Sequence, residues 1–277
     1  MAKSSAPATV RGSTRPRPRA VVRRLVFITL VGILVAITVF CGRIGLIWFT
    51  ELRRTTPVYD PPVLAGQYLS NGCSAGVYAK RADGLIVLTT TGHCLVEGQS
   101  VYAMDGRLAG IASAPTNWAS CDKAGMNRCT GSDMAYVAVT PSMIPWGRLD
   151  QVDMGAGGYR TVAQGTRALT CADVMDGDAI EFDGRSLFRT GRTFAREAYD
   201  FLPDRTYFPC IVLTDVSADG GDSGGLVLVK GLPAGVASRV FGPDQLMGFT
   251  PLADGLDELG LTMCDTPDCG LPAPSTK

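Results

Sequence analysis

The chain has 277 residues, of which 46% are hydrophobic and 33 are glycines, so it can form a packed globular domain that is rich in turns. Its formal net charge of zero hides an asymmetry, since residues 1–54 hold 10 Lys and Arg against one acid, whereas the remainder holds 16 basic and 25 acidic residues. An acidic globular part excludes nucleic acid as an expected partner, because a phosphate backbone binds basic surfaces.

The N-terminal part of the chain predicts one membrane span. Residues 1–24 form a basic tail without acids, and residues 25–42 are apolar and uncharged, so we expect a signal-anchor helix over residues 25–49. The basic tail would stay in the cytoplasm and the rest of the chain would cross the membrane. A cleaved signal peptide, which would release the domain, is the alternative, but the far end of the run carries Phe40, Arg43 and Trp48 instead of small residues.

Residues 50–66 carry three prolines and predict a short, stiff linker, and residues 67–277 predict a single extracytoplasmic domain. Short runs rich in Val, Ile, Leu and Thr alternate there with turn residues, which is typical of an all-β sandwich or barrel. The expected strands cover residues 76–79, 85–90, 134–139, 211–216, 226–229 and 235–240. A short helix is expected at Leu252, Leu256 and Leu259, with Thr250 as a candidate cap and Pro251 in the first turn.

Nine cysteines are present, of which Cys41 lies in the apolar run. The other eight follow that run, at Cys73, Cys94, Cys121, Cys129, Cys171, Cys210, Cys264 and Cys269. An even number of cysteines beyond a membrane span predicts disulfides in an oxidising compartment, with free core thiols as the alternative. No metal or other cofactor is expected, because the chain has one histidine and no Cys-x-x-Cys pair.

The run DGGDSGG at residues 219–225 carries the clearest chemical signal. A nucleophilic serine needs a hydroxyl on a tight turn and backbone N–H groups directed at the oxyanion that forms on attack. Glycines permit the unusual φ values that such a turn requires. Ser223 is therefore the candidate nucleophile, and an ordinary glycine-rich turn is the alternative.

The single histidine distinguishes between two classes of serine hydrolase. In α/β-hydrolases the order along the chain is Ser, acid, His, but His93 precedes Ser223 by 130 residues and no histidine follows it. The order His, Asp, Ser remains available. His93 follows an apolar run and precedes Cys94, so a strand end and a disulfide would hold it as a general base. A structural histidine is the alternative.

Asp133 is the candidate third member, which must orient the imidazole. It opens the apolar run 134–139, whereas its competitors are expected to be acids on solvated loops. These competitors are Asp105, Asp122, Asp150 and Asp153.

These three motifs resemble those of the trypsin-like (chymotrypsin-fold) serine proteases, especially the small bacterial members. Thr91-Gly-His-Cys94 is similar to the family's His motif, Asp133-Met-Ala-Tyr136 to its Asp motif, and residues 221–225 to its Ser motif. The resemblance implies an all-β fold of two six-stranded antiparallel β-barrels with a short C-terminal helix. It also implies an oxyanion hole made by the N–H groups of Gly221 and Ser223.

The same resemblance implies further roles. The expected disulfides are Cys73–Cys94, Cys121–Cys129, Cys171–Cys210 and Cys264–Cys269. Ser238 matches a serine that bonds the triad aspartate, and Ser217, Ser238 and Val240 would line the substrate pocket. Ser217 stands where trypsin-like enzymes have an Asp, which argues against Lys or Arg specificity. Some bacterial members use an internal arginine in place of a new N-terminus, so we expect an enzyme that folds active without N-terminal cleavage.

The sequence therefore predicts a membrane-anchored serine endopeptidase that acts on protein or peptide substrates through His93, Asp133 and Ser223. Two alternatives stay open, a trypsin-like scaffold that only binds and an esterase with the same triad. The sequence leaves the oligomeric state open.

Overall fold

The computed structural model of the chain describes residues 63–113, 132–185, 187–195, 208 and 210–272. The expected tail, anchor helix and most of the linker lie outside the described residues, as do Cys121 and Cys129. Within the described ranges, no helix is long and apolar enough to cross a membrane. All of these residues belong to one compact unit, which extends from Pro57 to Lys277.

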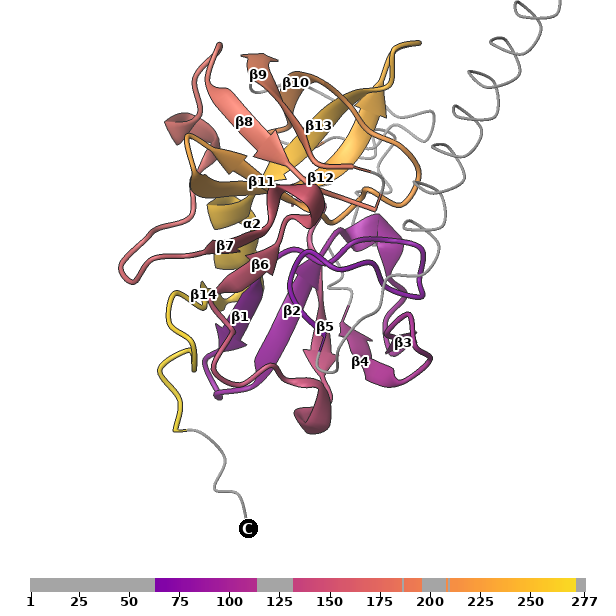
Figure 1. Ribbon diagram of the computed structural model, residues 1–277, viewed down its shortest axis with the longest axis vertical. Coiled ribbons are helices and arrows are strands. Elements are labelled where there is room, and N and C mark those ends of the chain that lie inside the picture. Colours follow the sequence, from indigo (N-terminus) through magenta and orange to yellow (C-terminus); the bar gives the residue numbers. More distant parts are fainter. Residues whose placement is uncertain (1–62, 114–131, 186, 196–207, 209, 273–277) are drawn as a thin grey trace, which may run out of the picture. The chain divides into compact units, whose positions relative to one another are not determined.

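The first layer of this unit is a six-stranded antiparallel sheet with the order β14-β1-β2-β5-β4-β3, drawn in the lower half of Figure 1. Its strands are β1 (Tyr78–Arg81), β2 (Ile86–Thr90), β3 (Ser100–Tyr102), β4 (Leu108–Ser113), β5 (Ala135–Val139) and β14 (Leu261–Met263). The expectation of a closed barrel is wrong here, since the sheet stays open between β3 and β14. Strand β3 has only three residues, and the segment at Leu69 bridges to Ala103 just beyond it.

The second layer is a closed barrel with the order β10-β13-β12-β11-β8-β9, in the upper half of Figure 1. Its strands are β8 (Ala179–Phe182), β9 (Arg189–Ala195), β10 (Val212–Ser217), β11 (Leu226–Val229), β12 (Leu232–Phe241) and β13 (Leu246–Pro251). A separate hairpin of β6 (Gln151–Asp153) and β7 (Tyr159–Thr161) lies between the two in sequence. The barrel confirms the second half of the expected fold.

The hydrophobic core explains why the two layers stay together. Leu226, Leu228 and Val236 belong to strands of the barrel, yet they pack with the core of the first sheet. The opposite faces of β11 and β12, including Val227 and Ala237, pack inside the barrel. Because side chains alternate between the two faces of a strand, β11 and β12 serve both cores at once.

All six strands expected from the sequence are present, with bounds that differ by up to three residues, and β11 coincides with its expected range. The sequence pattern missed eight other strands. These are β3, β4, β6, β7, β8, β9, β13 and β14. Several of these strands have only three residues, and in β9 exposed and half-buried residues predominate, so they lack the apolar run on which the expectation rested.

The expected C-terminal helix is present as α2 (Leu252–Leu259), with Leu252 and Leu256 buried. The candidate cap Thr250 is wrong, because Thr250 belongs to β13 and Pro251 occupies the cap position without a side-chain hydrogen bond. Gly260, with a φ of 63°, ends the helix in the left-handed conformation that glycine favours.

The packed domain extends further toward the N-terminus than the expected boundary at Gln67. Val63, Leu64 and Ala65 are buried, and the Tyr78 hydroxyl donates a hydrogen bond to the Val63 carbonyl at 2.5 Å. Ala65 also bridges to Val152 in the β6–β7 hairpin. The last residues of the expected linker are therefore core residues of the domain.

Candidate active site

His93 and Asp133 lie at the same end of the first sheet because of how β2 and β5 pair. Thr90, the last residue of β2, is opposite Ala135, the first residue of β5. His93 follows three residues later in a short 3₁₀ turn, Gly92–Cys94, and Asp133 precedes β5 by two residues. Residues 40 apart in sequence therefore meet at one sheet end.

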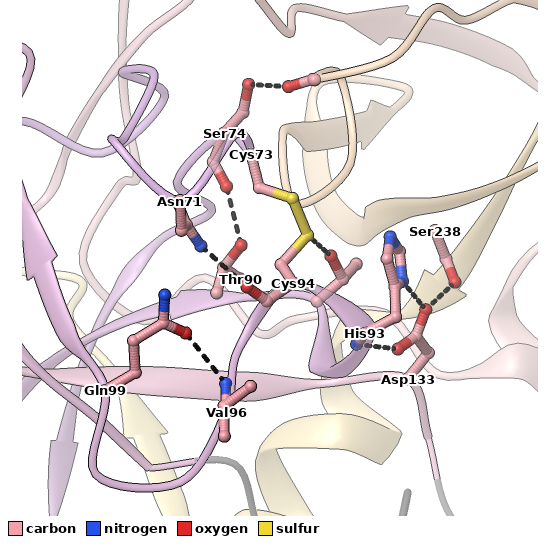
Figure 2. The surroundings of a disulfide bond; sticks show 12 residues. Asn71, Cys73, Ser74, Thr90, His93, Cys94, Val96, Gln99, Asp133 and Ser238 are labelled. Carbon is pink, nitrogen blue, oxygen red and sulfur yellow. Dashed lines mark hydrogen bonds and ion pairs between the residues drawn. A yellow bond between two sulfur atoms is a disulfide. The ribbon is translucent and has the colours of Figure 1, made fainter.

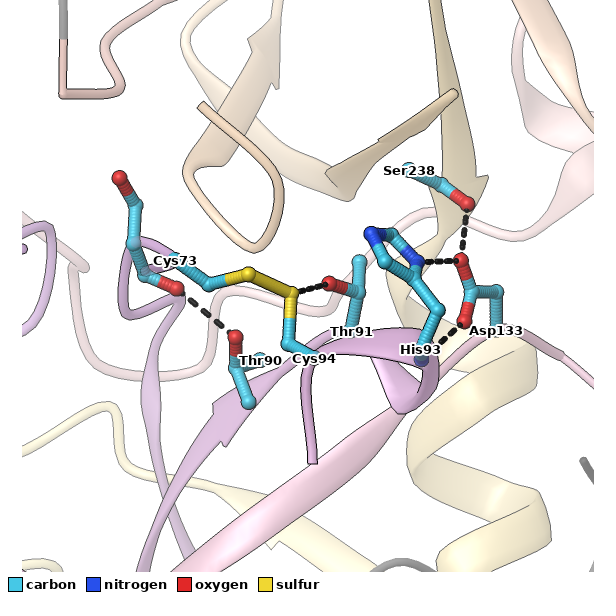
Figure 3. Close-up of polar contacts among 8 residues, drawn as sticks. Cys73, Thr90, Thr91, His93, Cys94, Asp133 and Ser238 are labelled. Carbon is cyan, nitrogen blue, oxygen red and sulfur yellow. Dashed lines mark hydrogen bonds and ion pairs between the residues drawn. A yellow bond between two sulfur atoms is a disulfide. The ribbon is translucent and has the colours of Figure 1, made fainter. Parts of the chain in front are cut away.

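Asp133 accepts three hydrogen bonds that fix the imidazole. Its Oδ2 lies 2.7 Å from Nδ1 of His93 and 2.5 Å from the donating hydroxyl of Ser238, and its Oδ1 accepts the backbone N–H of His93 at 3.0 Å. Figure 3 shows the carboxylate between His93 and Ser238. Since Ser238 belongs to β12, this bond also connects the first sheet with the barrel.

The electrostatics of Asp133 favour its ionised form. Burial of this side chain raises its pKa, but the hydrogen bond and charge of His93, the charge of Arg239 and the Ser238 hydroxyl outweigh burial and lower the pKa below its usual value. An ionised Asp133 can only accept, so Nδ1 of His93 is the donor in this hydrogen bond, and in the neutral tautomer Nε2 is then the acceptor nitrogen of the ring.

A disulfide braces the turn that carries His93. Cys73 and Cys94 are joined, with their Cα atoms 6.2 Å apart, and the Asn71 amide donates to the Cys94 carbonyl at 3.2 Å. Figure 2 shows this disulfide beside His93. The Thr90 hydroxyl also donates to the Ser74 carbonyl at 2.8 Å. The end of β2 and the disulfide therefore restrict the movement of the turn that carries the imidazole. A general base requires such a rigid position.

The turn at residues 219–225 needs its glycines. Gly221 has a φ of 100° and Gly224 a φ of 89°, both in the region that side chains rarely adopt. A Cβ at Gly224 would lie 2.1 Å from the Ser74 carbonyl oxygen, so the two segments could not approach. The sequence pattern at this turn therefore reflects real backbone requirements.

The turn is held from two sides. On one side Ser74 donates its N–H to the Ser223 carbonyl at 2.7 Å and its hydroxyl to the Gly221 carbonyl at 2.9 Å. On the other side the Gly224 N–H donates to the carbonyl of Ala237 in β12 at 2.7 Å, and the Ala237 N–H donates to the Gly225 carbonyl at 2.9 Å. Among the described residues, the N–H groups of Gly221 and Ser223 donate to no protein acceptor, so both remain able to bind an oxyanion.

Beneath the turn, Asp222 is fully buried and its charge is balanced by Arg189 at the start of β9. Nη1 of Arg189 lies 2.9 Å from Oδ2 of Asp222, and Nη2 lies 3.0 Å from Oδ2 of Asp219. Asp222 also accepts the Asp219 N–H at 2.9 Å. The Arg189 guanidinium therefore binds both ends of the segment 219–222, which precedes Ser223.

Asp183 is a second buried acid near this ion pair. Burial, and then the negative charges of Asp153 and Asp222, raise its pKa to about 7, while Arg189 opposes the shift. Because a charge in a poorly solvated place beside like charges is costly, this carboxyl is largely protonated below neutral pH.

A cavity of about 460 Å³ opens beside the turn. Its walls are formed by His93, by the turn that carries Ser223, by strand β12 and by Gln245. The lining residues are His93, Ala218, Asp219, Gly220, Ser223, Ala237, Ser238, Arg239, Val240 and Gln245. His93 and Ser223 therefore face the same space. Of the three residues predicted for the substrate pocket, Ser238 and Val240 line this cavity. Ser217 does not line it, and its side chain is exposed while its neighbours Val216 and Ala218 are buried.

Two charged or polar side chains in this cavity, Arg239 and Gln245, had no signal in the sequence analysis, whereas Asp219 begins the run that marks Ser223. Arg239 is half-buried with its guanidinium 5.2 Å from the centre of the Phe208 ring, and Asp219 pairs with Arg189. Gln245 enters from the turn before β13. Arginine and glutamine have no motif in the sequence that would mark them, since their place in the cavity depends on the pairing of β12 with β13.

Helix α2 supports Asp133 from behind, which the sequence also did not indicate. Glu258 accepts hydrogen bonds from the N–H and hydroxyl of Ser132 at 2.6 and 2.7 Å. A Cβ at Gly255 would lie 2.1 Å from the sulfur of Met134, so the helix backbone packs directly on that side chain. Asp133 is thus held between two residues that α2 contacts.

The other aspartates that were candidates for the third member of the triad have different partners or lie elsewhere in the fold. Asp105 pairs with Arg107 at the β3–β4 turn, and Asp153 accepts the Gly155 N–H at 3.0 Å. Burial and the charges of Asp265 and Asp268 raise the pKa of Asp150, which lies before β6. Asp122 is outside the described residues.

Three of the four expected disulfides lie among the described residues: Cys73–Cys94, Cys171–Cys210 and Cys264–Cys269. The group of His93 with Cys73 and Cys94 is close enough to bind a metal ion, and no other His, Cys or acid group in the described residues is. Both sulfurs of this group are used in the disulfide, which leaves them without the thiolate that a metal requires.

No protein-family model matches the chain, and no curated protein matches it. Solved structures do. Nocardiopsis protease shares 23% identity with a TM-score of 0.56, over 73% of this chain and 98% of its own. Thermobifida fusca protease A shares 22% identity with a TM-score of 0.55, over 73% and 98%. Cellulomonas bogoriensis chymotrypsin shares 24% identity with a TM-score of 0.55, over 74% and 100%. The described part of the chain therefore has the chymotrypsin fold of small bacterial serine proteases.

Proposed function

We propose that the protein is a serine endopeptidase that cleaves peptide bonds through an acyl-enzyme, with Ser223 as nucleophile, His93 as general base and then acid, and Asp133 as the residue that orients His93. The observation that carries this proposal is the hydrogen-bonded cluster of His93, Asp133 and Ser238. His93 and Ser238 line the same cavity as Ser223. In that arrangement the base is positioned by hydrogen bonds and faces the serine.

The mechanism assigns one role to each of the three side chains. The Ser223 hydroxyl attacks the peptide carbonyl while Nε2 of His93 takes its proton, and Asp133 stabilises the imidazolium through Nδ1–H. The N–H groups of Gly221 and Ser223 would bind the oxyanion. The C–N bond then breaks as His93 gives the proton to the leaving amine, and a water molecule activated by His93 hydrolyses the Ser223 ester.

The cavity favours small or medium apolar side chains over Lys or Arg. A basic side chain needs an acidic partner at the pocket, but the Asp219 carboxylate already pairs with Arg189, and Arg239 adds a positive charge to the wall. Val240 lines the cavity with 53% of its surface exposed, and a valine at this position leaves less room than a glycine would for the side chain that binds there.

The Arg189–Asp222 pair supports a further part of the proposal, that the enzyme folds active without N-terminal cleavage. In this arrangement an internal guanidinium supplies the charge that stabilises Asp222 and thereby the turn before Ser223. N-terminal sequencing of active protein checks this, and an active form that begins at a newly cut residue near 64–68 would contradict it.

The N-terminal apolar run adds membrane anchoring to the proposal, with the protease domain on the far side of the membrane. Its support is the uncharged stretch 25–42 behind a basic tail. The full chain should sediment with membranes and need detergent for extraction, whereas a variant that lacks residues 1–49 should be soluble. Recovery of the full chain, uncut, in the soluble fraction would contradict an anchor.

The direct test of catalysis uses a fluorophosphonate probe, which forms a bond with an activated serine. The native chain should be labelled and should release new amino termini from peptides. Ser223→Ala should abolish both, while Ser217→Ala, outside the cavity, should retain them. A folded native chain that is not labelled would refute the proposal in favour of a binding scaffold. Cleavage of esters without peptides would indicate an esterase.

A further inference from the structure

The turn that carries Ser223 also contacts an exposed guanidinium outside the cavity. Arg185, in the loop between β8 and β9, and half-buried Tyr68 both pack on Gly221. A Cβ at Gly221 would lie 2.7 Å from Cδ of Arg185 and 3.0 Å from Cε2 of Tyr68. Both side chains thus lie in van der Waals range of the proposed oxyanion residue.

Tyr68 holds Arg185 in place. The guanidinium carbon lies 4.9 Å from the centre of the Tyr68 ring, which is a cation–π contact. Among the described residues Arg185 makes no ion pair, and neighbouring Asp183 is buried. The positive charge of Arg185 is therefore held in position by Tyr68 but is not neutralised by an ion pair among the described residues. It lies in a part of the chain that has more acidic than basic residues.

The position of this charge relative to Ser223 determines what it can contact. The cavity that would hold the acyl half of a peptide is lined by residues 218–220 and 237–240, and neither Tyr68 nor Arg185 lines it. The turn is bounded on its other side by the segment that runs from Tyr68 to Ser74. A peptide whose acyl half fills that cavity would direct its leaving half toward Tyr68 and Arg185.

We propose, on the basis of the protease function above, that Arg185 and Tyr68 form a subsite that selects a carboxylate in the first two residues after the cleaved bond. Two residues of extended chain span about 7 Å, which matches a site next to the oxyanion turn. The carboxylate can belong to an Asp or Glu side chain or to the C-terminus of a short leaving group, since a guanidinium binds both in the same way.

The test is cleavage of a degenerate peptide mixture by the full chain, with sequencing of the new amino termini by mass spectrometry. Native protein should enrich Asp and Glu at the first or second position by about fivefold, the size expected of an exposed but positioned ion pair. Arg185→Gln should abolish this enrichment, and Arg185→Glu should replace it with a preference for Lys and Arg.

Arg148→Gln is the matched control, because Arg148 also lies over a tyrosine ring, 5.1 Å from the centre of Tyr159, but lines no part of the site. It should leave the enrichment unchanged. Absence of acidic enrichment in the native protein, or its persistence in Arg185→Gln, would overturn the proposal.

Two further measurements separate the alternatives. Peptides with a free C-terminal carboxylate two residues after the cut, compared with their amides, distinguish a terminal from a side-chain carboxylate. Hydrolysis of p-nitrophenyl acetate, which has no leaving peptide, measures catalysis without this subsite and should be equal in the native chain and in the control Arg148→Gln. If ester hydrolysis persists while acidic enrichment is absent, the subsite is wrong and the protease mechanism stands. If neither ester nor peptide is cleaved, the proposed function itself fails.

Discussion

Arg189 contacts Asp222 through an Nη1–Oδ2 distance of 2.9 Å, and only 1% of the Asp222 side chain is exposed. The other nitrogen of the same guanidinium reaches Asp219, so the charge pair closes the segment immediately before Ser223. A buried carboxylate without a partner is among the most costly groups in a protein, which makes this pair a sensitive point of the fold.

Arg189→Gln should therefore destabilise the domain by about 3–5 kcal/mol, the cost of leaving a buried charge unpaired. Labelling of Ser223 by a fluorophosphonate should fall as well, because the turn loses the ion pairs of Arg189 with Asp219 and Asp222. Urea unfolding followed by fluorescence measures the first effect. The control is Arg167→Gln, which removes an ion pair of similar geometry at the surface and should change little. Equal effects of the two substitutions would contradict this reading.

Asp183 should make the domain less stable as pH rises. Its folded pKa of about 7 lies above the ordinary value of 3.8, so the folded state binds the proton more tightly than the unfolded state. This contribution is fully present below pH 4 and is lost between about pH 4 and pH 7. Asp183→Asn should remove that slope and stabilise the domain above neutral pH by up to roughly 4 kcal/mol.

The measurement is the free energy of unfolding of native protein and Asp183→Asn at several pH values. The two should coincide near pH 4 and diverge toward pH 8. Asp244→Asn, at an exposed turn residue, should follow the native curve. A variant that is less stable than the native protein at pH 8 would show that the ionised carboxyl is stabilising instead.

Asp133→Asn should lower kcat by roughly 10⁴-fold, because an amide can present its N–H to Nδ1 and so stabilise the wrong tautomer of His93. Ser238→Ala removes one hydrogen bond to the same carboxylate and should lower kcat by roughly tenfold with little change in KM. Steady-state kinetics on a cleaved peptide checks both. A larger loss in Ser238→Ala than in Asp133→Asn would reverse the assigned roles.

Val240→Gly should widen the cavity. The ratio of kcat/KM for substrates with Phe over those with Ala before the cut should rise by roughly tenfold, the usual discrimination of an apolar pocket that changes by a few methyl groups. Val240→Leu should shift the ratio the other way. Unchanged ratios in both variants would place the specificity pocket elsewhere.

The disulfides should contribute unequally. Cys171–Cys210 encloses 39 residues and Cys264–Cys269 encloses 5, so replacing the first pair by alanines should cost about 4 kcal/mol and the second about 2 kcal/mol. Thermal unfolding of the two double variants orders them. A greater loss from the short loop would indicate that local packing at Cys264, and not chain entropy, dominates.

The sequence identified the residues that the fold brings together around His93, because each belongs to a local motif whose chemistry is legible. Ser223 lies among glycines with positive φ on either side, and Asp133 precedes a buried strand. Ser238 and the cysteine pairs came only from the resemblance to a family. A single sequence therefore contains two kinds of information: local motifs, and residues that match the motifs of a known family.

The groups that the sequence did not reveal depend on contacts between distant segments. Arg189 looks like any other arginine on a strand until β9 is placed beneath Asp222. Gly255 reads as a weak point in a helix, yet it allows α2 to approach Met134. Ser217 was placed in the pocket by counting from Ser223, but alternation along β10 turns it outward. The open first sheet likewise has no counterpart in the apolar pattern, because the order of its strands is set by pairing between distant segments.

The position of β14 has a consequence for the order of events as the chain is made. Leu261–Met263 is the last strand in sequence, yet it pairs with β1, the first. His93 and Asp133 leave the ribosome long before Ser238, and the first sheet lacks its edge until residue 263 has emerged. The growing chain therefore cannot assemble the complete His93–Asp133–Ser238 cluster before synthesis is almost finished, which delays formation of the proposed active site during biosynthesis.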